Sequence, residues 1–140
     1  METIKSGTFL TKKGQKLASQ FNKAIPSQCI IQKCKTTKGK YNYAILLSKD
    51  FVSDLGNGMQ QRDYAILYGA SDSLTLIYNK NNFVFAGDKM TCFSNEVTVR
   101  DYLIDKLEPK KGDIVIITSS DDKFVAEISA INTALWTLNN

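Results

Sequence analysis

Lys12–Lys49 reads KKGQKLASQFNKAIPSQCIIQKCKTTKGKYNYAILLSK, and this stretch organises the expected fold. It predicts a basic helix followed by a basic β-hairpin. Thr11 is a suitable helix N-cap and Pro26 a helix stop, and apolar residues recur between them at helical spacing. Two strands are expected after Pro26, at Cys29–Lys35 and Tyr41–Leu47, because strand-favouring residues flank a turn that contains glycine.

Positive charge is concentrated in this part of the chain. Residues 1–50 hold ten lysines and two acidic residues, a net charge of +8, whereas residues 51–140 hold eight basic and twelve acidic residues, a net charge of −4. The overall charge is therefore only +4, although positive and negative charge are distributed unevenly between the two parts of the chain. A basic segment of this kind binds nucleic acid or an acidic protein, or it forms a solvated surface.

The composition is that of a folded globular protein, with 43% hydrophobic and 10% aromatic residues among 140. A chain of this length buries a sizeable core, so we expect a single α+β domain over residues 1–140. Its apolar runs are far shorter than a membrane span, and its first residues lack the apolar region of a signal peptide. We therefore expect no membrane partner and an intracellular location, in the host cytoplasm or the virion if the protein is viral.

Short apolar runs separated by turn residues fill most of the remaining chain. They predict strands at Tyr64–Tyr68, Leu74–Tyr78, Phe83–Ala86, Met90–Phe93, Ile114–Thr118 and Phe124–Ile128. The connections are too short for parallel crossovers, so the sheet is expected to be antiparallel. Thr98 predicts the start of a second helix, which Pro109 ends. The expected fold class is α+β: an antiparallel, meander-like sheet of about seven strands with two main helices.

Three connecting segments carry further signals. Ser48 is suited to cap a short helix that ends at Gly56 in the left-handed conformation. Residues 57–61 are expected to form a mobile loop. The last segment, Ile131–Leu138, is interpreted as a strand or a short helical turn that packs against the core.

Several predicted strands are apolar on both faces, as in AILL, YAILY, LTLIY and IVII. A half-exposed antiparallel strand alternates apolar and polar residues, so both faces of this sheet need cover. Two interpretations remain open. The cover comes from a second sheet or barrel closure within one chain, or it comes from a protein–protein or oligomer interface.

Histidine is absent from the chain, which excludes Ser–His and Cys–His nucleophile pairs and histidine-containing zinc sites. The three cysteines, an odd number, are expected to be reduced packing thiols. The sequence contains neither a glycine-rich phosphate loop nor the spacing of a calcium loop. We therefore expect no metal, no cofactor and no enzymatic activity.

Paired carboxylates are the remaining enzymatic candidates. Asp50 with Asp54, and Asp101 with Asp105, have the i,i+4 spacing that places two acids on one helix face, where they can hold Mg²⁺ or act as an acid–base pair. Near a helix N-terminus such acids are more often surface residues stabilised by the helix dipole.

A strand pair in GDIVIITSSDDKFVAEIS faintly resembles a nuclease site, with Asp113, Asp122 and Glu127 as its acids. The residues after Glu127 are isoleucine and serine, so the lysine that such a site uses to stabilise charge is missing.

Thr8–Ala18, with the sequence TFLTKKGQKLA, resembles two known helix starts. It is similar to the L-T-x-x-G-x-x-L turn and helix near the end of winged-helix domains, although no helix-turn-helix precedes it. It also resembles the helix that opens many phage tail-collar and fibre proteins, which its place before a hairpin suits better. The second resemblance, together with the high lysine and asparagine content of the chain, implies a viral (phage) or mobile-element origin.

The basic helix and hairpin form the expected functional surface. The expected contact residues are Lys12, Lys16, Lys23, Lys33, Lys35, Lys38, Lys40, Tyr41 and Tyr43. We expect a small non-enzymatic binding or assembly protein that uses this surface to dock an acidic partner, or a neighbouring subunit in a homo-oligomer. The alternative is a nucleic-acid-binding domain in which the lysines contact phosphates and the tyrosines stack on bases.

Overall fold

The computed structural model describes residues 24–31, 39–52, 55–56, 58–87, 90–93 and 96–138. The expected basic helix over residues 12–25 lies outside these ranges except for its last two residues. The expected turn of the hairpin, at residues 36–39, lies outside them except for Gly39. The resemblance of Thr8–Ala18 to other helix starts also concerns residues outside the described part.

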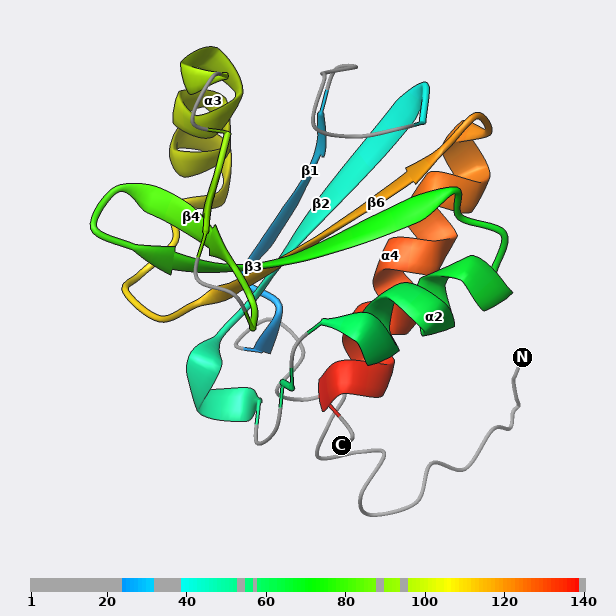
Figure 1. The fold of residues 1–140 in the computed structure, drawn as a ribbon, viewed down its shortest axis with the longest axis horizontal. Helices are drawn as coiled ribbons and strands as arrows, with labels where there is room; N and C mark the ends of the chain where they lie inside the picture. Colours follow the sequence, from blue (N-terminus) through cyan, green and yellow to red (C-terminus); the bar gives the residue numbers. More distant parts are fainter. Residues whose placement is uncertain are drawn as a thin grey trace, which may run out of the picture.

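Six strands form one antiparallel sheet in the spatial order β1-β2-β6-β3-β4-β5 (Figure 1). The strands are β1 Ser27–Ile31, β2 Tyr41–Leu47, β3 Asp72–Asn79, β4 Asn82–Phe85, β5 Thr91–Cys92 and β6 Ile114–Ser120. Three α-helices accompany them within the described ranges: α2 Met59–Leu67, α3 Val97–Leu107 and α4 Lys123–Leu138. The expected α+β class with an antiparallel sheet is confirmed.

The last strand in the sequence, β6, lies at the centre of the sheet between β2 and β3. It pairs with β2 over Tyr41–Leu47 and with β3 over Asp72–Ile77, and all seven of its residues are buried. The sheet is therefore a meander only from β3 to β5. Its middle is filled by a strand that follows α3 in the chain.

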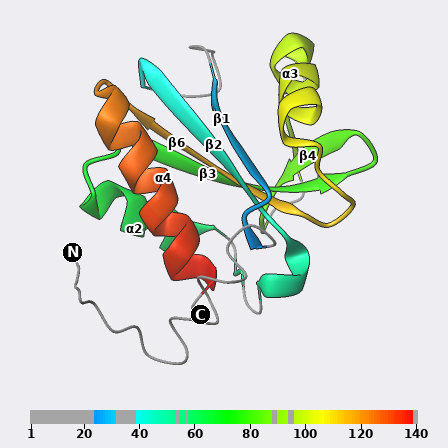
Figure 2. The ribbon, with the colours of Figure 1, turned by 180° about the vertical axis from the view of Figure 1, so that it is seen from behind.

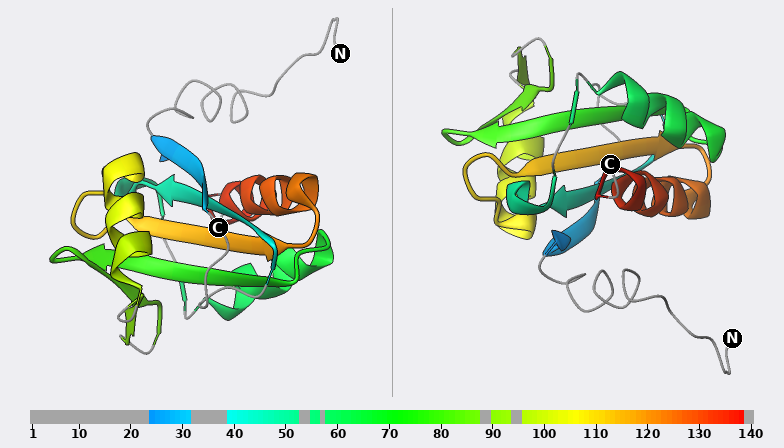
Figure 3. Two further views of the ribbon diagram at one scale, coloured as in Figure 1. Left: turned by 90° about the horizontal axis from the view of Figure 1, so that it is seen from above. Right: turned by 90° about the horizontal axis from the view of Figure 1, so that it is seen from below.

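Helices cover both faces of the sheet, which explains why its strands are apolar on both sides. Successive residues of β2 belong to two different cores: Leu46 packs in the core that contains Leu103 of α3, and Ile45 packs in the core that contains Ala134 of α4. Figures 1 and 2 show α3 on one side of the strands and α2 and α4 on the other. Figure 3 shows β2 (cyan), β6 (orange) and β3 (green) side by side. Burial of the strands thus needs neither a second sheet nor a neighbouring subunit.

Two segments that were expected to be strands are helical instead. Tyr64–Tyr68 lies in and just after α2, and Phe124–Ile128 is the first part of α4. Short apolar runs do not distinguish a strand from a buried helix by their period alone. In α2 the buried residues Gln61 and Ala65 are four apart, which is the helical spacing. Ile131–Leu138 continues α4, so the helical interpretation of that segment is the correct one.

Several element boundaries differ from expectation, among them the first strand, which begins at Ser27 and not at Cys29. The short helix near Ser48 is a single 3-10 turn at Lys49–Phe51. Residues 59–61, expected in a loop, form the first turn of α2, whereas Asn57 lies outside the described residues. α3 begins at Val97, so the expected cap Thr98 is inside the helix. Gly56 does adopt the expected left-handed conformation, with φ of 67°.

The turn between β3 and β4 is a tight two-residue hairpin. Asn79 pairs with Asn82, and the residues between them, Lys80 and Asn81, both have positive φ. This is the backbone of a type I′ turn, whose twist matches that of the flanking strands. The turn residues recognised in the sequence therefore act as expected here.

Candidate functional site

Three of the nine expected contact residues lie in the described part of the chain: Lys40, Tyr41 and Tyr43. The other six lie outside it, and they are Lys12, Lys16, Lys23, Lys33, Lys35 and Lys38. The complete basic surface therefore stays a prediction.

Lys40 and Tyr41 form a cation–aromatic contact at the start of β2. The Lys40 Nζ lies 5.9 Å from the centre of the Tyr41 ring. The backbone N–H of Lys40 donates a hydrogen bond to Asp121 Oδ1 at 3.1 Å, which connects this end of β2 to the turn after β6. Tyr41 is half-buried, so part of its ring remains open to a partner.

Tyr43 is a core residue, with only 9% of its surface exposed. It packs with Ala126 and Ala130 of α4, and its hydroxyl donates a hydrogen bond to Gln28 Oε1 on β1. Burial raises the pKa of Tyr43 above its usual value, and the charge of Glu127 raises it further. In this conformation the Tyr43 ring has no open face on which a base could stack.

A small hollow of about 40 Å³ lies where β1 and β2 meet the first turns of α4. It is lined by Ile30, Tyr41, Asn42, Tyr43, Lys123, Ala126 and Glu127. Its charged residues are one lysine and one glutamate, so the hollow itself is not strongly basic.

Large apolar side chains are exposed at the end of α2 and at the start of α4. Figure 1 shows the start of β2, the end of β6 and the start of α4 close together at the upper right, with the end of α2 lower on the same side. Leu67 at the end of α2 is 81% exposed, and Phe124 in the first turn of α4 is 67% exposed. The turn after α2 touches α4, because a Cβ added at Gly69 would lie 3.2 Å from Val125 Cγ1. We use the name hairpin-end surface for the exposed and half-buried residues at these element ends: Lys40, Tyr41, Leu67, Tyr68, Lys123 and Phe124.

Aromatic rings hold α2 against the last turn of α4. The Tyr64 ring stacks on Trp136, with ring centres 5.2 Å apart, and it also contacts the Tyr68 ring at 5.3 Å. The Tyr64 and Tyr68 hydroxyls lie 3.4 Å apart, and their hydrogen bond raises the pKa of Tyr64. These contacts fix α2 against the end of α4 that is opposite Phe124.

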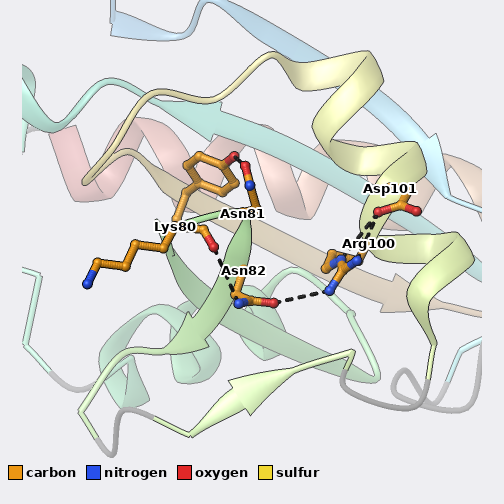
Figure 4. A network of polar contacts seen from close by, with 6 residues as sticks. Lys80, Asn81, Asn82, Arg100 and Asp101 are labelled. Atoms are coloured by element: carbon orange, nitrogen blue, oxygen red, sulfur yellow. Dashed lines mark hydrogen bonds and ion pairs between the residues drawn. The ribbon is translucent and has the colours of Figure 1, made fainter.

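The acid pair Asp101 and Asp105 lies on α3, where Asp101 forms an ion pair with its neighbour Arg100 at 3.3 Å. Arg100 Nη1 also donates to Asn82 Oδ1 at 3.2 Å, which fastens α3 to the β3–β4 hairpin (Figure 4). No group of three or more cysteine, aspartate or glutamate residues that could hold a metal occurs within the described ranges. Of the other pair, Asp54 lies outside those ranges.

The three acids of the nuclease-like pattern do not converge. Asp113 is buried before β6, where its carboxylate accepts the backbone N–H groups of Lys49 and Lys110 at 3.3 and 2.9 Å. Asp122 follows β6 and caps α4, and Glu127 is exposed on that helix. The expected strand pair is wrong because its second member is helical.

A second, larger hollow of about 190 Å³ lies at the start of α2, and none of the nine expected contact residues lines it. It is lined by Gly58, Met59, Arg62, Ser73, Leu74, Thr75, Phe85 and Ala86. The available sequence signals were the Asn57–Gly58 pair before a helix and two hydroxyl residues, Ser73 and Thr75, inside an apolar strand. Neither signal is specific without the fold that brings them together.

These features define a class: a small α+β domain whose six-stranded antiparallel sheet is covered by helices on both faces. Within that class the chain belongs to the family described as a domain of unknown function (DUF4443), whose profile matches residues 38–138. A solved structure, "Hypothetical protein PH0730 from Pyrococcus horikoshii OT3", shares the fold with a TM-score of 0.71. It is 24% identical, and the match covers 96% of this chain and 68% of that chain.

No curated protein matches the chain. Among the described residues, no helix is long and apolar enough to cross a membrane. The viral origin expected from the sequence stays a prediction that the comparisons do not test.

Proposed function

We propose that this protein is a non-enzymatic binding domain that docks an acidic protein through the hairpin-end surface. The observation that carries the proposal is the high exposure of Phe124, next to Lys123 in the first turn of α4, and of Leu67 at the end of α2, whose following turn touches α4. Large apolar side chains surrounded by polar and charged ones have the composition of a protein interface. Large exposed apolar residues that cluster on a soluble protein often mark such a site.

An acidic partner is favoured by the charges near this surface. The hairpin turn next to Lys40 adds Lys33, Lys35 and Lys38 in the sequence. The carboxylates of this region, Asp121, Asp122 and Glu127, are exposed as well, and two of them have local roles: Asp121 accepts the N–H of Lys40, and Asp122 caps α4. In residues 33–40 and 121–127 five lysines stand against these three acids, and an excess of positive charge accelerates and orients docking to an acidic partner.

The experiment compares which proteins co-purify with the wild-type chain and with matched surface variants, identified by mass spectrometry. Leu67→Asp and Phe124→Asp test the apolar centre, and Val97→Asp, on an exposed apolar residue of α3, is their control. Lys40→Glu with Lys123→Glu tests the rim, and Lys110→Glu with Lys111→Glu, beyond the other end of β6, is the charge control. An acidic protein that is lost only with the hairpin-end variants supports the proposal.

If every hairpin-end variant co-purifies with the same proteins as the wild-type chain, the proposal is wrong. A light-scattering mass of several subunits that falls to one in Leu67→Asp would instead show that the occupant is a second copy of this chain.

Nucleic acid remains the rival partner, favoured by the Lys40–Tyr41 contact and the basic first 50 residues. Titration with labelled DNA and RNA at two salt concentrations separates it from a protein partner. Binding that weakens steeply with salt, and that Tyr41→Ala reduces, would favour this rival.

A further inference from the structure

We propose that the hollow at the start of α2 is a binding site for a phosphoryl group, either free phosphate or the phosphate of a small molecule. The site combines a helix N-terminus, two buried hydroxyl groups without partners and an arginine. It lies apart from the hairpin-end surface and does not depend on the function proposed for that surface.

The first turn of α2 is open to an anion. Its N-cap is Gly58, which has no side chain to accept the backbone N–H groups of that turn, and the turn contains no acidic residue. The N–H groups at the start of a helix have no acceptor within the helix, and the helix dipole adds partial positive charge there. Anions bind at such ends because the N–H groups point at them.

Two hydroxyl groups of β3 line the hollow beside this helix end. Ser73 and Thr75 are each only 6% exposed, and neither Ser73 Oγ nor Thr75 Oγ1 has a hydrogen-bond partner within the described structure. They are two residues apart in the strand, so both side chains lie on the face that α2 covers. A buried hydroxyl without an acceptor is unfavourable, and a ligand that accepts its hydrogen bond would remove that cost.

Gly58 brings the helix end close to the Thr75 hydroxyl. It has φ of 88°, and a Cβ added there would lie 3.2 Å from Thr75 Cβ and 3.5 Å from Thr75 Oγ1. A side chain at this position would therefore fill the space in front of the hydroxyl. The hollow, at about 190 Å³, is far larger than the roughly 10–15 Å³ that one water needs.

Arg62 supplies a full positive charge at the rim. Its Nε donates to Asp72 Oδ1 at 2.9 Å, which fixes the side chain next to β3. Asp72 itself is not among the residues that line the hollow. Ala86 adds an apolar side chain on the same face, since its Cβ would lie 3.9 Å from a Cβ added at Gly58.

The test is calorimetric titration of the full chain with sodium phosphate, with sodium chloride at equal ionic strength as the control. We expect saturable binding of phosphate and none of chloride. Adenosine monophosphate and adenosine form a second pair that differ only in the phosphoryl group. Tighter binding of the nucleotide than of phosphate would identify a phosphorylated molecule as the ligand, and equal binding would identify the free ion.

Thr75→Val and Ser73→Ala remove the two hydroxyls with little change in shape. Each is expected to raise the dissociation constant for phosphate about tenfold or more, because a hydrogen bond to a charged group is lost. Thr133→Val is the matched control, since Thr133 Oγ1 is also buried without a partner but lies on α4, outside the hollow. It should leave the constant unchanged.

Each variant is checked for its melting temperature without ligand, which should not fall, because removing an unpartnered buried hydroxyl costs little. The proposal is overturned if phosphate acts as chloride does, or if Thr75→Val and Ser73→Ala both bind phosphate like the wild type. It is also overturned if adenosine binds as well as its monophosphate. Should one of the two variants fail to fold, the other together with Arg62→Gln decides the outcome.

Discussion

Asn42 and Ser119 form a buried polar pair near the end of the sheet where β2 begins and β6 ends. They lie opposite each other on β2 and β6, and Ser119 Oγ donates to Asn42 Oδ1 at 2.6 Å. Both residues are buried, and the Asn42 Nδ2 group has no partner within the described structure. This hydrogen bond is therefore the partner that the structure gives to the Asn42 side chain within the described residues.

Ser119→Ala should lower the free energy of unfolding by about 1–3 kcal/mol, because the Asn42 carbonyl then loses its donor. The double variant Ser119→Ala with Asn42→Val should recover part of that loss, since it removes the unsatisfied group as well. Urea denaturation followed by circular dichroism measures both. A single variant as stable as the wild type would show that the bond contributes little.

Cys29 is expected to be an unreactive thiol. Burial raises its pKa from 9.0 to about 11, and the nearby charge of Lys106 only partly opposes this shift. Alkylation by iodoacetamide at pH 8 should therefore be about a hundredfold slower than for a thiol of pKa 9, because the thiolate is the reacting form. The rate should rise steeply as the pH approaches 11.

The measurement uses a chain with Cys34→Ser and Cys92→Ser, so that Cys29 is the only thiol. A rate equal to that of a free cysteine peptide would contradict the raised pKa.

α4 shows how an element can be misassigned from a short apolar run. FVAEI has the composition of a strand, yet it begins a helix of 16 residues. The start of the helix is fixed by Asp122, whose Oδ1 accepts the N–H groups of Phe124 at 2.8 Å and Val125 at 3.3 Å. The capping residue was visible in the sequence, but it was interpreted as part of a turn between two strands.

Asp122→Ala should destabilise the protein by about 1 kcal/mol, because two N–H groups of α4 lose their acceptor. Asp122→Asn is the control, since asparagine is an equally good N-cap and should stay within a few tenths of a kcal/mol of the wild type. Thermal and urea unfolding report both values. Equal losses in the two variants would mean that the charge of Asp122, rather than its cap, stabilises the helix.

The whole molecule is a sheet with helices on both faces, so its exposed apolar residues are not needed to complete the core. Leu67 and Phe124 are exposed and belong to none of the three core clusters of the described residues. This separation of core from exposed end is what allows the proposed docking surface to be altered without unfolding the protein.

Leu67→Asp and Phe124→Asp should each change the free energy of unfolding by no more than about 0.5 kcal/mol, because exposed positions without special contacts tolerate substitution. Leu103→Ala, at a fully buried position on α3, should cost about 2–5 kcal/mol in the same assay. A large loss of stability in the two surface variants would assign Leu67 and Phe124 to the fold instead of to docking.

The sequence by itself determined the local features of this protein. The Asn79–Asn82 turn, the strands before and after it, β2, β6 and the helix that ends before Pro109 follow from turn residues and apolar patterns. The need to cover both faces of the sheet also followed, because AILL and IVII are apolar on each side. These signals are local, so neighbouring residues suffice to produce them.

Only the tertiary structure decided the rest. The helical state of Tyr64–Leu67 and Phe124–Ile128 depends on packing against the sheet, which outweighs the strand preference of short apolar runs. The central place of β6 is a choice among partners far apart in the chain. The hollow of Gly58, Ser73 and Thr75 exists because α2 docks on β3. Contacts between distant residues cannot be read from a single sequence, since their energy appears only when the chain has folded.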